Sequence, residues 1–127
     1  MSLQPGLVAT VEMTVTEQDT APSFQSGDVP VLATGRVVGL AESATVLAVE
    51  KGLEEGTTTV GYRVQLDHLA PTPVGGGVKA EAMLEAVHGR RLTFRVSVTD
   101  ARGLVAAGKI TRVIVERERF LEKAVGG

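Results

Sequence analysis

The period of the apolar residues changes along this chain, and that change constrains the fold more than any other feature. Residues 7–15 place apolar side chains at every second position, which is typical of a half-buried β-strand. From Val31 to about Lys51 the apolar positions recur instead with the period of an α-helix. Asp28 can cap this helix, Pro30 suits its first turn and Gly52 can end it. The pattern predicts one strand followed by one helix of about five turns.

Four further stretches return to the alternating pattern and follow one another closely. They cover residues 58–68, 78–87, 92–98 and 104–115. The chain also contains 20 valines and 15 glycines, which favour strands and the turns between them. Consecutive strands joined by short turns form antiparallel sheets, and the helix must lie across one face. We therefore expect a single α+β domain over residues 1–127 with the element order β-α-β-β-β-β.

Apolar residues also occur on the faces of these strands opposite to the main apolar set. They are Val87, Val105, Val113 and Val115. One helix cannot cover both faces of a sheet, so this pattern predicts that a second subunit covers part of the molecule.

Composition excludes several classes of protein. A net charge of −2 without a basic run, together with only one tyrosine and three phenylalanines, argues against binding to nucleic acid. No apolar run approaches the roughly 18 residues of a membrane span, and no signal-peptide pattern begins the chain. The chain contains no cysteine, which fits a reducing compartment. We expect a cytoplasmic protein without a membrane partner, metal or bound cofactor.

Three polar residues interrupt apolar patterns. Glu42 lies within about 20° of the helical stripe through Val31 and Val49. His68 ends the apolar face of the strand at 58–68, and Arg112 shares a face with apolar neighbours. A buried charge without a partner costs several kcal/mol, so each is either paired within the fold or directed at a ligand. For Glu42 the two interpretations stay open, whereas a lone histidine such as His68 is more often structural.

Thr34 lies in the first turn of the predicted helix, about 12 Å along the axis from Glu42. Free backbone N–H groups gather there and favour an anion or a carbonyl oxygen. An ordinary first-turn threonine is the simpler interpretation. His88 lies in a tight turn before Gly89, where we expect it to be solvated.

Several of these segments together resemble a known family. They are Val31–Glu42, Gly61, Val64–His68, His88–Ser97 and Arg112. The set is similar to the fluoroacetyl-CoA thioesterase group of hotdog-fold proteins. The resemblance implies a hotdog fold, in which a five-stranded antiparallel sheet wraps around one long helix. It also implies a homodimer that hydrolyses an acyl-CoA substrate at the subunit interface.

The resemblance further assigns roles to individual residues. Thr34, Glu42 and His68 match the family's catalytic group, and Arg112 matches a pocket-lining arginine. His68 would activate water or protonate the leaving thiolate, and Glu42 would orient the imidazole or attack the thioester itself. The hydroxyl of Thr34 would position one of these groups. A backbone N–H near Gly61 would stabilise the oxyanion.

The segment before the helix departs from the family pattern. The fluoroacetyl-specific enzyme carries bulky phenylalanines there. In this chain residues 25–30 contain no aromatic residue, and Phe24 is the nearest one. We therefore expect a short or medium acyl-CoA as substrate. The alternative function is a non-catalytic module that binds acyl thioesters, with Glu42 and His68 as a buried structural pair. A hydratase of the same fold uses a different Asp/His arrangement, which this sequence does not match.

Overall fold

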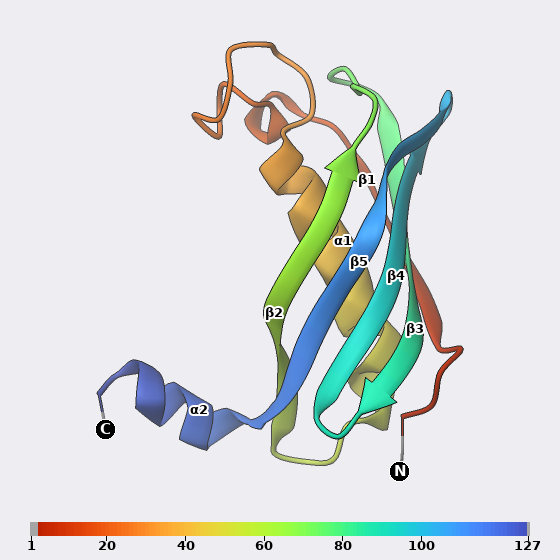
Figure 1. The fold of residues 1–127 in the computed structure, drawn as a ribbon. Coiled ribbons are helices and arrows are strands. Elements are labelled where there is room, and N and C mark those ends of the chain that lie inside the picture. The colour runs from red at the N-terminus through yellow and green to blue at the C-terminus, as the bar shows by residue number, and fades with distance from the viewer. Residues whose placement is uncertain (1–2, 127) are drawn as a thin grey trace.

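A computed structural model describes residues 3–126 as a five-stranded sheet curved around one long helix (Figure 1). The elements are β1 (Val8–Thr14), α1 (Thr34–Val49), β2 (Thr57–His68), β3 (Gly77–His88), β4 (Arg91–Asp100), β5 (Gly103–Glu116) and α2 (Arg117–Ala124), with short 3-10 turns at Glu17–Asp19 and Glu50–Gly52. All strand pairs are antiparallel, in the order β1-β3-β4-β5-β2. The predicted α+β topology is confirmed, and α2 is an additional helix. Residues 1–2 and 127, at the ends of the predicted domain, lie outside the described residues.

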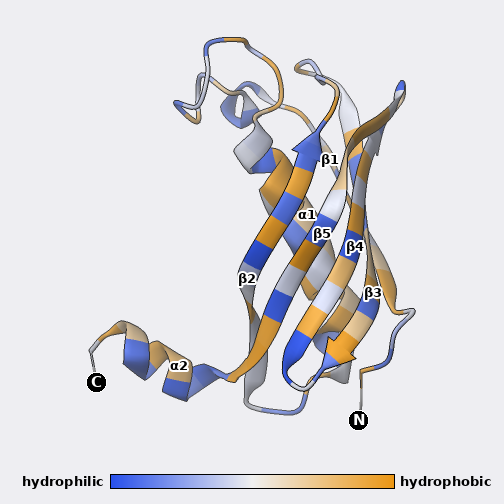
Figure 2. Ribbon diagram, in the orientation of Figure 1, coloured by the Kyte–Doolittle hydropathy of each residue, from blue (hydrophilic) through white to orange (hydrophobic). Residues whose placement is uncertain are grey.

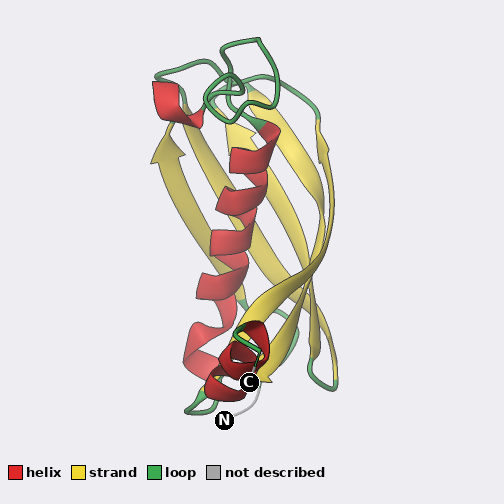
Figure 3. Cartoon of the chain, turned by 90° about the vertical axis from the view of Figure 1, so that its left-hand side faces the viewer, coloured by secondary structure: helices red, strands yellow, loops and turns green. Residues whose placement is uncertain are grey.

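The core fills the space between α1 and the concave face of the sheet. The largest side chains in it include Phe94, Leu84 and Ile110, all fully buried. Along the strands apolar and polar residues alternate, so that one face of the sheet meets the helix and the other meets solvent (Figure 2). Figure 3 shows α1 running along the sheet on its inner side. None of the described helices is long and apolar enough to cross a membrane.

Helix α1 begins three residues later than predicted, with Ala33 rather than Asp28 at its N-cap. The reason is that residues 31 and 32 are held extended by backbone bridges to Pro73 and Thr72. The last predicted turn is the 3-10 turn that ends at Gly52. The buried face of α1 is formed by Val37, Leu40, Ala41, Ala44, Thr45 and Val49. Glu42 therefore lies at the border of the buried face and not at its centre, with 35% of its side chain exposed.

A β-bulge at Tyr62 divides strand β2 into two parts. Gly61 opposes Arg112 on β5, and Arg63 opposes the next residue, so Tyr62 has no partner in the pairing. The extra residue exchanges the two faces of the strand. The prediction that His68 ends one continuous apolar face of the strand at 58–68 is therefore wrong. Before the bulge Thr59 and Gly61 face α1, and after it Leu66 and His68 do.

Two further bulges, at Glu85 on β3 and at Val105 on β5, act in the same way. Because each exchanges the faces, Val87 packs against the core and Val105 is fully buried within the chain. The expectation that both lie on an outer face is wrong. Val113 and Val115 of the predicted outer set are partly exposed, as is Val87.

Candidate functional site

The N-terminal end of α1 meets the C-terminal end of β2. Thr34 is the first residue of the helix and His68 is the last residue of the strand. The Thr34 hydroxyl lies 2.8 Å from His68 Nδ1, a hydrogen bond whose direction depends on the histidine tautomer. The other ring nitrogen, His68 Nε2, is buried and has no hydrogen-bond partner within residues 3–126. A buried nitrogen of this kind is available to give a proton to a ligand or to take one from it.

Two helical turns further along α1, Glu42 pairs with Arg112. Arg112 Nη1 lies 3.3 Å from Glu42 Oε2, and only 7% of the arginine is exposed. Two further bonds hold the guanidinium: Nε donates to the Thr59 hydroxyl at 2.8 Å and Nη2 to the Thr59 carbonyl at 3.0 Å. Burial lowers the pKa of Arg112 below its ordinary value, and the adjacent Glu42 carboxylate partly offsets this. The arginine stays charged, because its ordinary pKa is far above neutral pH.

Gly61 makes room for the Glu42 carboxylate. A Cβ atom built on Gly61 would lie 2.6 Å from Glu42 Oε2, closer than real Cβ contacts come. Gly61 also faces Arg112 across the β2–β5 pair. The glycine therefore lets the carboxylate lie directly against the strand, beside the bulge at Tyr62.

For the thioester hydrolysis that the family resemblance implies, we expect Gly61→Ala to displace the Glu42 carboxylate from Arg112 and to lower kcat at least about tenfold. The fold should persist, because the obstructed group is the end of a flexible side chain. Gly77→Ala is the matched control, since a Cβ at Gly77 meets nothing within 4 Å. Thiol-release kinetics and thermal melts of both variants test this expectation. Equal activities of the two variants would show that the close approach at Gly61 has no role in turnover.

The five predicted site residues lie along the line where α1 faces β2, but in two groups. Thr34 and His68 form one pair, and Glu42 with Arg112 and Gly61 forms the other. Within residues 3–126, no hydrogen bond joins Glu42 to Thr34 or to His68. The carboxylate is thus held by the arginine, in agreement with the expectation that Arg112 needs an anionic partner.

Sequence patterns did not point to Thr59, which supplies two of the three acceptors for Arg112. It is the last of three consecutive threonines, and nothing in the local pattern distinguishes it from its neighbours. His88 is exposed at the end of β3, in line with the predicted solvated turn.

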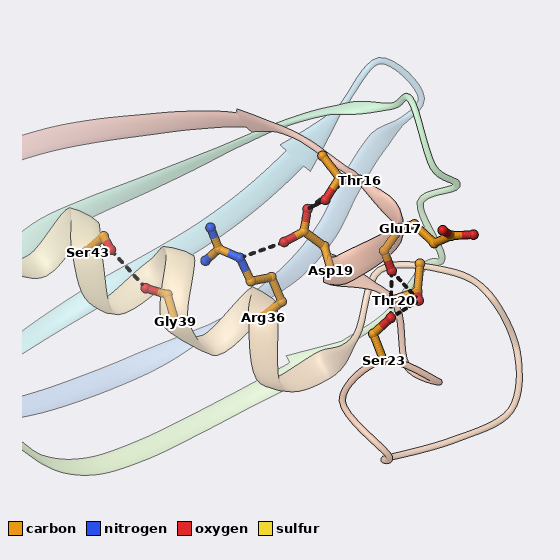
Figure 4. A network of polar contacts seen from close by, with 8 residues as sticks. All are labelled: Thr16, Glu17, Asp19, Thr20, Ser23, Arg36, Gly39 and Ser43. Carbon is orange, nitrogen blue, oxygen red and sulfur yellow. Dashed lines mark hydrogen bonds and ion pairs between the residues drawn. The ribbon is translucent and has the colours of Figure 1, made fainter.

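The segment between β1 and α1 is fastened at the start of the helix by Asp19 (Figure 4). Its carboxylate accepts from the Thr16 backbone N–H at 2.7 Å, from the Thr16 hydroxyl at 2.8 Å and from Arg36 Nε at 3.1 Å. These bonds, with the Thr16 N–H first, lower the pKa of Asp19 below its ordinary value. Phe24 lies against Gly35, with a ring carbon 3.2 Å from where a Cβ would be. The aromatic ring thus lies over the helix start, next to Thr34.

The chain is similar to a family of known proteins. Residues 15–118 match the model of a family described as fluoroacetyl-CoA-specific thioesterase. A fluoroacetyl-CoA thioesterase from Streptantibioticus cattleyicolor is 40% identical over 93 residues, which are 73% of this chain and 67% of that protein. A solved structure of the fluoroacetyl-CoA thioesterase FlK has a TM-score of 0.90 at 32% identity, covering 98% of this chain and 96% of the other. A thioesterase superfamily member from Thermus thermophilus has a TM-score of 0.88 at 30% identity, covering 94% and 89%.

The sheet, its central helix and these similarities define the class as a hotdog-fold thioesterase, as the sequence analysis expects. Within that class, the chain belongs to the fluoroacetyl-CoA-specific thioesterase family. Of the two predicted functions, a thioester hydrolase is therefore the correct one, and a non-catalytic binding module is not. Residues 3–126 contain no group of three or more His, Asp or Glu side chains placed to hold a metal ion.

Proposed function

We propose that this chain hydrolyses short or medium acyl-CoA thioesters as a homodimer, with Thr34, Glu42 and His68 as its catalytic group. The observation that carries the proposal is the pair of polar groups along α1. At one end a histidine keeps a buried ring nitrogen without a partner, and at the other a partly exposed carboxylate is held by a buried arginine. The thioester would lie between them, with the reacting carbonyl within reach of both.

Glu42 acts directly on the substrate in this proposal. One of its oxygens is anchored by Arg112, and a charge-assisted bond of this kind fixes the direction of the carboxylate. Glu42 either attacks the thioester carbonyl carbon, forming an anhydride that water then hydrolyses, or takes a proton from the attacking water. A role in orienting the imidazole is not favoured, because Glu42 contacts Arg112 and not His68.

His68 handles the proton of the leaving group. When the Thr34 hydroxyl donates to Nδ1, the Nε2 atom carries the proton and can protonate the departing CoA thiolate. When Nδ1 carries the proton and donates to Thr34, Nε2 is instead a base that activates water. In both cases Thr34 is a positioning residue, because it sets the tautomer and the ring orientation.

Gly61 and Arg112 complete the substrate site in this proposal. Gly61 adjoins the bulge on β2, the last strand of the sheet, where the regular pairing with β5 is interrupted. A backbone N–H in this segment would stabilise the oxyanion that forms on the thioester oxygen. Arg112 adds a positive charge on the same side of the site.

The acyl group is proposed to be short or medium in length. The relatives' names refer to fluoroacetyl-CoA, but residues 25–30 of this chain contain no aromatic side chain that could close over so small a group. Phe24 lies at the helix start instead. A cavity of about 370 Å³ opens between the end of α1 and the start of β2, but its lining includes Glu50, Glu54, Glu55 and Arg117, so the acyl chain is not assigned to it.

The homodimer is supported by the free edge of β2. The stretch 61–65 in the middle of this edge strand is exposed, and Tyr62 and Val64 are among its exposed side chains. A long strand with unpaired backbone groups is a ready surface for pairing with another strand. We propose that two copies pair here, which places both sites near the subunit interface. We also propose that the protein acts in the cytoplasm, since a chain without cysteine fits a reducing compartment.

Release of free thiol from a panel of acyl-CoA esters tests the proposal. The panel runs from acetyl- and fluoroacetyl-CoA through hexanoyl- to palmitoyl-CoA, each assayed at several enzyme concentrations. We expect the highest kcat/KM for a short or medium ester and a steep loss at palmitoyl-CoA. A maximum at fluoroacetyl-CoA with little turnover of other esters would overturn the proposed substrate class. Absence of turnover across the panel would overturn the assignment of acyl-CoA as substrate.

A further inference from the structure

Helix α2 is poorly accommodated by its own chain. It has eight residues and none of them is buried. Leu121 is 62% exposed and Val125, which follows the helix, is 76% exposed. A cavity of about 320 Å³ lies between the helix and β5, lined by Ile114 and Phe120 among others. Because a helix of this length is marginal in water, it needs a packing surface that its own chain does not supply.

The direction of α2 indicates where that surface lies. The helix starts at Arg117, whose backbone N–H donates to the Gly56 carbonyl just before β2. From there it extends past β2, beyond the free edge of the sheet, as Figures 1 and 3 show from two directions. Its length is about 12 Å, which is more than two strand spacings of about 4.8 Å. Any strand paired to the edge of β2 would therefore lie within reach of α2.

Pairing between two copies has a definite consequence for the ends of β2. In a two-fold antiparallel pair, the start of one strand lies beside the end of the other. The end of β2 next to α2 begins at Thr57, so its neighbour in the second copy is the end that carries His68. The end of β2 that carries His68 also has apolar residues on its surface. Leu69 is 60% exposed, and Phe24 and Val29, in the segment before Thr34, are exposed too. Exposed apolar groups thus occur at both ends that such a pair would bring together.

We propose that α2 crosses onto the second copy and that Leu121 covers the partner's Thr34–His68 pair, so that each active site is completed by the other chain. This inference rests on the proposed homodimer. Covering this end would exclude water from the exposed Thr34 and from the bound thioester beside it. The occupant of the free face of α2 is thus a second copy of this chain.

Heterodimers with defects placed on chosen chains test the proposal. Two differently tagged chains are co-expressed, and mixed dimers are isolated by two successive affinity steps. In the first mixture one chain carries Glu42→Gln and the other carries Leu121→Asp, so the remaining intact site faces an intact α2. In the second mixture one chain carries both changes and the other is unaltered, so the intact site faces the damaged α2.

We expect the first heterodimer to keep about half of the wild-type kcat/KM per dimer. The kcat/KM of the second should be about tenfold lower than that of the first, because this is the effect of exposing one leucine that is otherwise buried. Glu118→Gln replaces Leu121→Asp in the control dimers, since it changes the same helix without an apolar group. The same difference between the two heterodimers is expected when a truncation after Arg117 replaces Leu121→Asp. This truncation removes no buried residue of α2.

Equal activities of the two heterodimers, or the reverse order, would overturn the proposal, because α2 would then act on its own chain or on neither site. Failure of the underlying function is distinguishable from this result. It would appear as absent turnover in the unaltered homodimer, or as a monomer by light scattering, before any heterodimer is compared.

Discussion

Glu42→Gln should lower kcat for the preferred acyl-CoA by at least about a thousandfold. The amide can neither attack the thioester carbonyl nor take a proton from water, whichever of these roles the carboxylate has. The fold should be retained, because the glutamine carbonyl can still accept a hydrogen bond from Arg112 and because Thr59 holds the guanidinium independently. Because the buried Arg112 loses its anionic partner but keeps its two bonds to Thr59, we expect the free energy of unfolding to fall by about 1 to 3 kcal/mol.

The measurement compares thiol release and thermal unfolding of the variant with those of Glu81→Gln. Glu81 is an exposed glutamate on β3 that points away from the site, so its amide variant carries the same charge change without the catalytic role. Retention of more than a tenth of the wild-type kcat in Glu42→Gln would show that Glu42 is a structural partner of Arg112. A large loss of stability with unchanged kcat per folded molecule would lead to the same conclusion.

The fold followed from the sequence because its determinants are local and repeated. Alternating apolar residues at 7–15 and in the four later stretches, interrupted by one helical period, define the order of the elements. The first residue of α1 could not be predicted from the sequence alone. Residues 31 and 32 fit the helical period, but backbone bonds to 72 and 73 hold them extended, and such a contact between distant segments leaves no local pattern.

Bulges limited what could be predicted about faces. A bulge adds one residue to a strand without a required sequence signature, and every side chain beyond it changes side. The bulge at Tyr62 is the reason that Thr59 and His68 both face α1, although their spacing in an unbroken strand would place them on opposite faces. Those at Glu85 and Val105 moved two valines from the expected outer surface into the core.

The site was predictable in its members but not in its pairing. Glu42, His68 and Arg112 stood out as polar groups among apolar neighbours, and such residues need partners when they are buried. Which of them pair depends on the register of β2 against β5 and against α1, where Gly61 faces both Glu42 and Arg112. Thr59 could not be found from the sequence, since its role arises only when the bulged strand brings it beside Arg112.

His68→Ala is the second change with a large expected effect, a loss of about a hundredfold to ten-thousandfold in kcat. It removes a buried ring nitrogen that has no hydrogen-bond partner within residues 3–126 and leaves the thiolate without a proton donor. The other histidine supplies the control, because His88→Ala removes an exposed imidazole at the end of β3 and should change neither kcat nor stability. Steady-state thiol release and thermal melts of both variants provide the comparison.

Variants of Thr34 separate catalysis by His68 from simple packing. Thr34→Ser keeps the hydroxyl that lies 2.8 Å from Nδ1, and we expect it to keep kcat within about fivefold of the unaltered chain. Thr34→Val keeps the shape of the side chain but removes the hydrogen bond, so the imidazole loses its fixed tautomer and kcat should fall at least about tenfold further. Equal kcat values for the serine and valine variants would show that the Thr34–His68 bond does not position the imidazole. The large loss of kcat in His68→Ala would then not depend on the orientation of the ring by Thr34.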